Sequence, residues 1–253
     1  MTLHEYIKNP MGQGNAVMTQ KDMYRKLYTE KLDKIIVREN GKIHYTLYYT
    51  KDDVYYIHIK IPSEVIEKFY YDTIIEFSTT NNALRTLGSL DAYNVRFYSN
   101  DPSFVYTYAH AFIKNDLFVA DLLPKMSKLA IKNPAKELNP KNVINYVKSL
   151  YFAYLIIMNY GLLKKDKFKV AGVKYSKKEM LSNVEHADKK VADRQDAQKL
   201  LDAKKRRERD EANKDTRNVS NASRTTKAIS KTPTVSTVKK VGTVRKTKVV
   251  KTK

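Results

Sequence analysis

Basic side chains without a nearby carboxylate are the residues of this sequence that point most directly to a chemical role. Residues 217–253 carry 11 Lys or Arg side chains and no Asp, Glu or aromatic side chain. A lysine or arginine placed near a phosphate releases condensed counterions, so such a segment binds with little base preference and with strong salt dependence. The residues expected to contact a polyanion there are Arg217, Arg224, Lys227, Lys231, Lys239, Lys240, Arg245, Lys246, Lys248, Lys251 and Lys253.

The expected partner of this basic segment is nucleic acid, in the form of DNA bound without sequence preference. No amphipathic, lipid-facing stripe accompanies the charge, which favours nucleic acid over an anionic membrane. Two alternatives stay open: a tail that only increases solubility, and a tail that contacts an acidic protein.

A second basic cluster precedes the tail and could add a further phosphate contact. Its members are Lys204, Lys205, Arg206 and Arg207, followed by Arg209. The neighbouring acidic residues Glu208, Asp210 and Glu211 neutralise part of its charge. The cluster is therefore either a second contact or the solvated face of a charged helix, and the sequence does not decide between them.

Catalytic and metal-binding residues are harder to find. None of the histidines has a second ligand at a recognised spacing, although His44 and His58 fall on separate predicted strands that could be neighbours. A metal-dependent nuclease could be assembled from the carboxylates Asp52, Asp53, Asp72 and Glu76. However, Asp52 and Asp53 lie in a predicted turn, where aspartate is expected on backbone grounds. We therefore expect no catalytic residue, no metal ligand and no cofactor.

Tyrosines could give the predicted sheet a second nucleic-acid surface, because aromatic rings stack on unpaired bases. The residues concerned are Tyr45, Tyr48, Tyr49, Tyr55 and Tyr56. Buried tyrosines are the more common alternative in sheets. Both faces of the predicted strands carry tyrosine, so the alternation leaves this choice open.

The composition divides the chain into a part with enough large apolar side chains to form a core and a part with too few. Residues 1–163 hold 18 of the 19 tyrosines and 7 of the 8 phenylalanines, with a net charge of only +4 of the total +21. The absence of cysteine excludes disulfides, thiolate zinc sites and thiol catalysis. The longest apolar window, residues 150–163, is shorter than the roughly twenty residues of a membrane helix, so no membrane span is expected.

Strands are predicted mainly in the first half of the chain. Turn signals at Asn40-Gly41 and at residues 51–53 separate three β-rich runs, 35–39, 42–50 and 54–61. Two shorter strands are expected at residues 73–79 and 94–99. In the third run the side chains expected to face the core are Tyr55, Ile57, Ile59 and Ile61.

Helices are predicted mainly after the strands. A short amphipathic helix is expected at residues 18–33, and a possible one at 83–88. Asp101-Pro102 begins a helix over 103–115, a further helix falls within 117–131, and residues 141–163 form a helix that stops at Gly161. In the charged region Met180, Val184, Ala187 and Val191 form a brief apolar seam, beyond which the pattern indicates a solvated helix.

The sequence thus predicts an α+β fold: a tyrosine-rich antiparallel β-meander followed by helices, then a long charged helix and a disordered basic C-terminal tail. The predicted divisions are an N-terminal arm (1–17), a globular α+β domain (18–163), a charged helical extension (164–216) and the tail (217–253).

Three stretches, MTLHEYIKNPMGQGNAV, YSNDPSFVYTYAHAF and KSLYFAYLIIMNYGLL, resemble uncharacterised proteins of tailed bacteriophages from low-GC hosts. The resemblance covers residues 1–163 and carries over no functional residue. It implies a virion or assembly protein near packaged DNA, located in the virion or the host cytoplasm. No secretory signal is expected, because no apolar stretch follows a basic start.

The predicted function is that of a non-enzymatic phage structural or assembly protein, whose globular domain docks on other protein subunits while the basic tail contacts DNA or another polyanion. One alternative is a nucleic-acid-binding regulator that prefers some sequence or structure. A metal-dependent nuclease is a further alternative.

Overall fold

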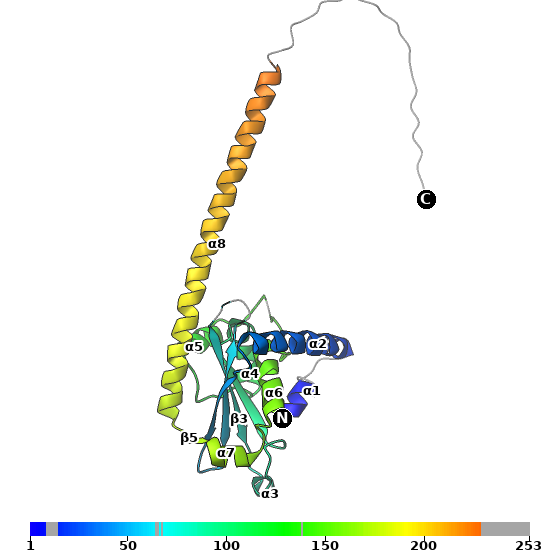
Figure 1. Cartoon of the computed structure of the whole chain (residues 1–253), viewed down its shortest axis with the longest axis vertical. Helices are drawn as coiled ribbons and strands as arrows, with labels where there is room; N and C mark the ends of the chain where they lie inside the picture. Colours follow the sequence, from blue (N-terminus) through cyan, green and yellow to red (C-terminus); the bar gives the residue numbers. More distant parts are fainter. Residues whose placement is uncertain (9–14, 64–65, 67, 138, 229–253) are drawn as a thin grey trace, which may run out of the picture. The chain divides into compact units, whose positions relative to one another are not determined.

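The computed structural model describes residues 1–8, 15–63, 66, 68–137 and 139–228 (Figure 1). The chain forms two compact units, Met1–Ala197 and Gln198–Lys253. The first unit contains the sheet and most of the helices. The helix α8 (Lys177–Ala228) begins in the first unit and supplies the described residues of the second.

A five-stranded sheet forms the centre of the first unit, with strand order β4-β3-β2-β1-β5. The four longer strands pair antiparallel and β5 is parallel to β1. Their bounds are β1 (His44–Tyr49), β2 (Tyr55–Pro62), β3 (Tyr70–Ser78), β4 (Asn94–Ser99) and β5 (Val173–Lys174). This antiparallel-rich sheet, accompanied by helices, confirms the predicted α+β class.

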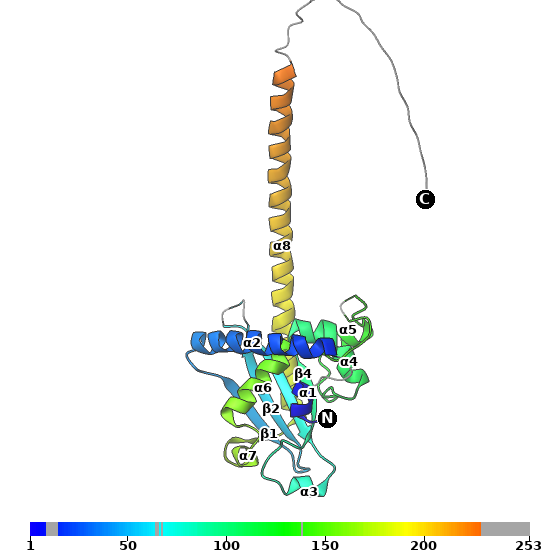
Figure 2. The ribbon, with the colours of Figure 1, turned by 90° about the vertical axis from the view of Figure 1, so that its right-hand side faces the viewer.

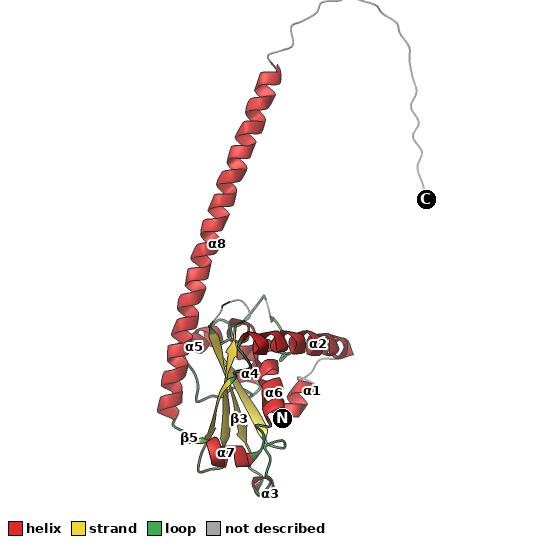
Figure 3. Cartoon of the chain, in the orientation of Figure 1, coloured by secondary structure: helices red, strands yellow, loops and turns green. Residues whose placement is uncertain are grey.

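Helices surround the sheet on both faces, as Figure 3 shows in red around the yellow strands. Besides α8 they are α1 (Leu3–Lys8), α2 (Asn15–Arg38), α3 (Asn82–Arg85), the π-helix η1 (Phe104–Tyr108), α4 (Ala109–Lys114), α5 (Lys125–Lys132), α6 (Lys148–Tyr160) and α7 (Lys165–Ala171). None of the described helices is long and apolar enough to cross a membrane.

The apolar face of the sheet packs against α6 and α1. Leu47, Ile57, Ile75 and Phe97 lie in register across four strands and are all buried. The ring of Tyr6, from α1, packs on Phe97 with 4.7 Å between ring centroids. Figure 2 shows α6 lying across this face. Of the four residues predicted to face the core, Ile57, Ile59 and Ile61 are buried and Tyr55 is half-buried.

The opposite face of the sheet is polar and is covered by the beginning of α8. Its cross-strand rows include Thr46, His58, Ile74 and Tyr98. The predicted seam packs there, because Met180, Val184 and Val191 are buried and Ala187 is half-buried. Every described side chain from Asp196 to Asp210 is exposed, so the solvated helix expected beyond the seam is also present.

In the predicted N-terminal arm, residues 3–8 form the helix α1, whereas residues 9–14 lie outside the described residues. In α1 the Thr2 hydroxyl accepts the Glu5 backbone N–H at 3.2 Å, and the Glu5 carboxylate accepts the Thr2 N–H at 2.7 Å. This reciprocal pair is a capping box, and its Thr-x-x-Glu spacing was visible in the sequence. Leu3, Tyr6 and Ile7 share one helical face and are buried.

The strand predicted at residues 35–39 is wrong, because α2 continues to Arg38. Leu32 and Ile35, three residues apart, lie on one helical face and are buried. Asn40-Gly41 ends this helix instead of joining two strands. Asn40 has a φ of 53°, and the Gly41 N–H donates to the Ile36 carbonyl at 2.8 Å. The bond closes a turn of six residues, from Ile36 to Gly41, which is the helix-ending pattern that Asn and Gly favour.

The helix predicted at 141–163 is present only from Lys148 onward. The residues before it form a loop that the Asn139 side chain holds: its amide donates to the Val143 carbonyl and accepts the Val143 N–H, both at 2.9 Å. The predicted stop is confirmed, since Gly161 has a left-handed φ of 59°. The start at Asp101 is also confirmed, because its carboxylate accepts the Ser103 N–H.

The boundary predicted between helix and tail at residue 216 needs correction, because α8 extends to Ala228. Ala, Lys, Arg and Glu are strong helix formers, and residues 177–228 contain no Pro or Gly to interrupt them. The prediction of disorder for residues 229–253 lies outside the described residues.

Candidate functional site

The basic cluster Lys204–Arg207 lies on a fully exposed stretch of α8 in the second unit. Lys204 and Arg206 each have a carboxylate four residues later, Glu208 and Asp210. Lys205 has Arg209 at the same spacing, which is a repulsive pair. Within the described part of the chain none of these five cations forms an ion pair. The cluster is therefore open to a partner around the whole helix.

The other predicted contacts divide into two groups. Three of them, Arg217, Arg224 and Lys227, lie within α8. The remaining eight, Lys231, Lys239, Lys240, Arg245, Lys246, Lys248, Lys251 and Lys253, lie outside the described residues. In sequence the second unit, Gln198–Lys253, carries 18 basic and 5 acidic side chains. Most of the chain's excess positive charge thus belongs to the helix that carries the basic cluster and to the residues after it.

The tyrosines proposed for base stacking are mostly engaged within the protein. Tyr48 and Tyr56 are buried, and Tyr56 stacks on Tyr175 with 4.4 Å between centroids. Tyr55 packs on Phe168 at 5.0 Å. Tyr45 and Tyr49, on β1, are 36% and 39% exposed. Of the five tyrosines, the structure therefore leaves only Tyr45 and Tyr49, both on β1, exposed for stacking on a base.

The carboxylates considered for a nuclease do not converge. Asp53 accepts hydrogen bonds from Tyr55 and Tyr93 and pairs with the Lys165 ammonium at 3.4 Å. Glu76 lies 3.6 Å from the Arg96 guanidinium. Among the described residues no group of three His, Asp or Glu side chains is arranged to hold a metal ion. These carboxylates therefore act as separate structural acceptors.

A buried, hydrogen-bonded pair of side chains, His58 and Asp72, lies on the polar face of the sheet, beneath α8. His58 Nε2 and Asp72 Oδ1 are 2.5 Å apart, on the adjacent strands β2 and β3. The Asp72 backbone N–H donates to the Asn100 side-chain oxygen at 2.7 Å. Both side chains are less than a tenth exposed. His44 is close to this pair, since His44 and His58 line one surface hollow, which agrees with the predicted neighbouring strands.

Asp188 brings a second buried carboxylate to the same layer. It projects from α8, and its Oδ1 accepts the Tyr98 hydroxyl at 2.9 Å. Its Oδ2 has no hydrogen-bond partner in the described part of the protein. Burial is the main reason that the pKa of Asp188 rises to about 7, and the nearby charge of Asp72 raises it further.

Sequence reasoning missed Asp188, although a signal was present. It stands four residues after Val184 and three before Val191, which is the spacing of the buried seam. A carboxylate at a seam position either reaches solvent through a gap in the packing or is buried with a hydrogen-bond partner. The neighbouring strand supplies that partner, Tyr98, and no sequence pattern connects the two.

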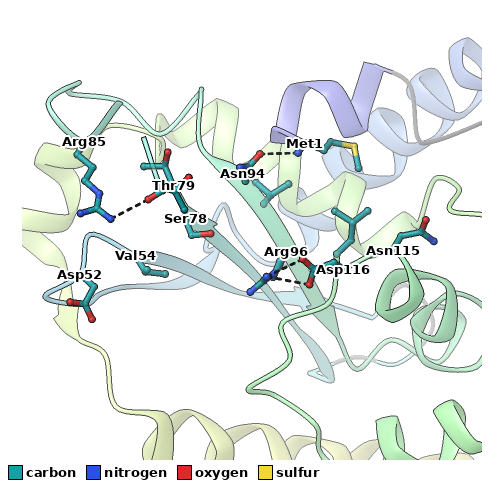
Figure 4. Close-up of a pocket in the computed structure, with 13 residues that line it drawn as sticks. Met1, Asp52, Val54, Ser78, Thr79, Arg85, Asn94, Arg96, Asn115 and Asp116 are labelled. Atoms are coloured by element: carbon teal, nitrogen blue, oxygen red, sulfur yellow. Dashed lines mark hydrogen bonds and ion pairs between the residues drawn. The ribbon is translucent and has the colours of Figure 1, made fainter. Parts of the chain in front are cut away.

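A surface hollow of about 590 Å³ lies beside β4 and the N-terminus (Figure 4). Its cations already have partners. Arg96 pairs with Asp116 at 3.2 Å, Arg85 donates to the Thr79 carbonyl at 3.3 Å, and the Met1 amino group donates to Asn94 at 2.8 Å. The carboxylates of Asp52 and Asp116, which also line the hollow, offset two of the three positive charges of Met1, Arg85 and Arg96, so little excess charge is left to attract an anion.

Fold and site together define an α+β body that continues into an exposed, strongly basic helix. Comparison with protein-family models, curated protein sequences and solved structures finds no match for this chain.

Proposed function

We propose that this protein is a non-enzymatic structural or assembly protein of the bacteriophage type, which binds DNA or another polyanion through its basic C-terminal extension. The observation that supports this most is the exposed cluster Lys204–Arg207, which forms no ion pair within the described residues. Unpaired, solvated cations gain the most from phosphate contacts, because they lose no existing partner on binding.

The geometry of the cluster favours backbone contact over base reading. Successive residues of a helix are 100° apart, so four consecutive cations point around the axis and do not form one reading face. Such an arrangement attracts phosphates from several directions but offers no fixed row of donors to a groove. In this proposal the first unit, with its two covered sheet faces, docks on other protein subunits.

Replacing Lys204, Lys205, Arg206 and Arg207 by glutamine tests the cluster. If all four contact duplex phosphates, the slope of log affinity against log salt should become shallower by about 3–4 units. A matched variant that neutralises four exposed lysines of the first unit, Lys51, Lys114, Lys128 and Lys132, removes the same charge. It should leave the slope unchanged, and equal slopes for both variants would contradict a role for the cluster.

Removing residues 217–253 tests the rest of the extension. At about 0.15 M salt the truncated protein should bind DNA at least about tenfold more weakly, while thermal unfolding of the first unit stays the same. Undiminished binding would show that the tail is not the contact. Competition among oligonucleotides at fixed salt should show almost no preference, whereas a regulator would discriminate between them by about a thousandfold or more.

A further inference from the structure

A second cavity, of about 310 Å³, lies between the polar face of the sheet and the beginning of α8. It is separate from the hollow in Figure 4 and is made entirely by the first unit. The lining residues that matter for binding are His58, Lys60, Lys68, Asp72, His186 and Lys190. They come from β2, β3, the connection between these strands, and α8, so only the folded unit brings them together.

Three lysines line this cavity. Lys60, Lys68 and Lys190 are exposed, and none of them forms an ion pair within the described residues. Asp72 is the one carboxylate in the described lining, and its Oδ1 is already 2.5 Å from His58 Nε2. Glu64 and Glu67 are close to Lys68 in sequence but lie outside the described residues. The described wall therefore carries an excess of positive charge.

The remaining lining suits an oxyanion with several oxygens. His186 lies one helical turn before Lys190, on the same side of α8. Thr46, Tyr48 and Asn183 add hydroxyl and amide groups to the wall. Lysines on three different elements can approach a tetrahedral anion from three directions, whereas a planar carboxylate would use fewer of them. The volume is near the lower end of the range of small-molecule sites, roughly 300–1,000 Å³.

We propose that this cavity binds a phosphate dianion, either inorganic phosphate or the phosphate monoester of a small molecule such as a mononucleotide. Lys60 and Lys190 hold the anion from opposite walls, and Lys68 closes the third side. The His58–Asp72 pair forms the floor, where the Asp72 carboxylate is hydrogen-bonded to the His58 imidazole. This site goes beyond the proposed function, because it needs neither the basic cluster Lys204–Arg207 nor the tail.

The chain's few histidines provide a direct measurement on the full-length protein. Titration with inorganic phosphate, followed by NMR of the imidazole groups at constant pH and ionic strength, should shift the signals of His58 and His186 with a single saturable affinity. His4 and His110 do not line the cavity and should not move. Equal shifts at all histidines, or no saturation at His58 and His186, would overturn the proposal.

Two lysine variants identify the ligands. Lys60→Gln combined with Lys190→Gln should weaken phosphate binding at least about tenfold, since two of the three ammonium groups are lost. Lys189→Gln is the matched control, because Lys189 is exposed on the same helix but is not part of the lining. It should change affinity by less than about twofold. Equal losses for Lys189→Gln and for the double variant would contradict the site.

A second titration with adenosine monophosphate distinguishes the two sources of the phosphate. Tighter binding than inorganic phosphate assigns the site to a phosphorylated small molecule, and equal binding assigns it to free phosphate. Weak or absent binding of both ligands at His58 and His186 rejects the proposal. Because DNA binding is measured separately through the salt slope of the Lys204–Arg207 variant, failure of either proposal leaves the other intact.

Discussion

Replacement of His58 by leucine is expected to lower the free energy of unfolding by about 3 kcal/mol, because the buried Asp72 carboxylate loses its hydrogen-bond partner. The Asp72 carboxylate would then remain buried beneath α8 without its imidazole. The measurement is urea unfolding of the full-length protein at neutral pH. His186→Leu is the matched control, because His186 lines the same cavity but is exposed.

A double substitution separates loss of the His58–Asp72 hydrogen bond from loss of packing. In His58→Leu with Asp72→Asn the uncompensated charge is absent, so part of the lost stability should return, with a coupling energy of about 1–3 kcal/mol. Additive effects of the two substitutions, or a cost for His58→Leu below about 1 kcal/mol, would show that the pair is not a stabilising unit.

Asp188→Asn should stabilise the protein at pH 8 and have little effect at pH 4. The folded-state pKa of Asp188 is raised from 3.8 to about 7, mainly by burial. Below the unfolded value both states hold the proton, so stability is fully present. As pH rises towards 7, the unfolded chain releases its proton while the folded one retains it, and stability is lost.

Asparagine cannot ionise, and its oxygen can still accept the Tyr98 hydroxyl. The variant should therefore gain on the order of 2–4 kcal/mol over the wild type at pH 8, as the pKa difference implies. Unfolding free energies at pH 4, 6 and 8 test this, with Asp193→Asn, an exposed position on the same helix, as the control. A pH dependence that is identical in wild type and Asp188→Asn would contradict the assignment.

His58→Leu and Asp188→Asn both act on the polar layer between the sheet and α8. Apolar seam residues hold α8 on this layer, while Asp188 weakens the docking as it ionises. The same layer forms the floor and one wall of the cationic cavity. A change in the docking of α8 would therefore alter the spacing of Lys60 and Lys190, which lie on opposite sides.

Much of the fold could be predicted wherever a local rule and the tertiary environment agree. The alternation in β2 located the buried isoleucines, Gly161 ended α6, and the spacing from Met180 to Val191 identified the packed part of α8. Predictions were wrong where the same sequence pattern occurs in two kinds of local structure. Asn-Gly suits both a hairpin and a helix end, and Ile35 after Leu32 fits a helix as well as a strand.

The sequence by itself determined where the charge lies, which residues can be apolar partners, and that the basic cluster Lys204–Arg207 lies on a helix beyond the end of its apolar seam. These properties depend on composition and on spacing within one element. Only the tertiary structure decided that α8 covers the polar face of the sheet, that Asp72 meets His58 and Asp188 meets Tyr98, and that three lysines surround one cavity. Such contacts join residues from different elements, and local propensity contains no information about which distant surfaces will pack together.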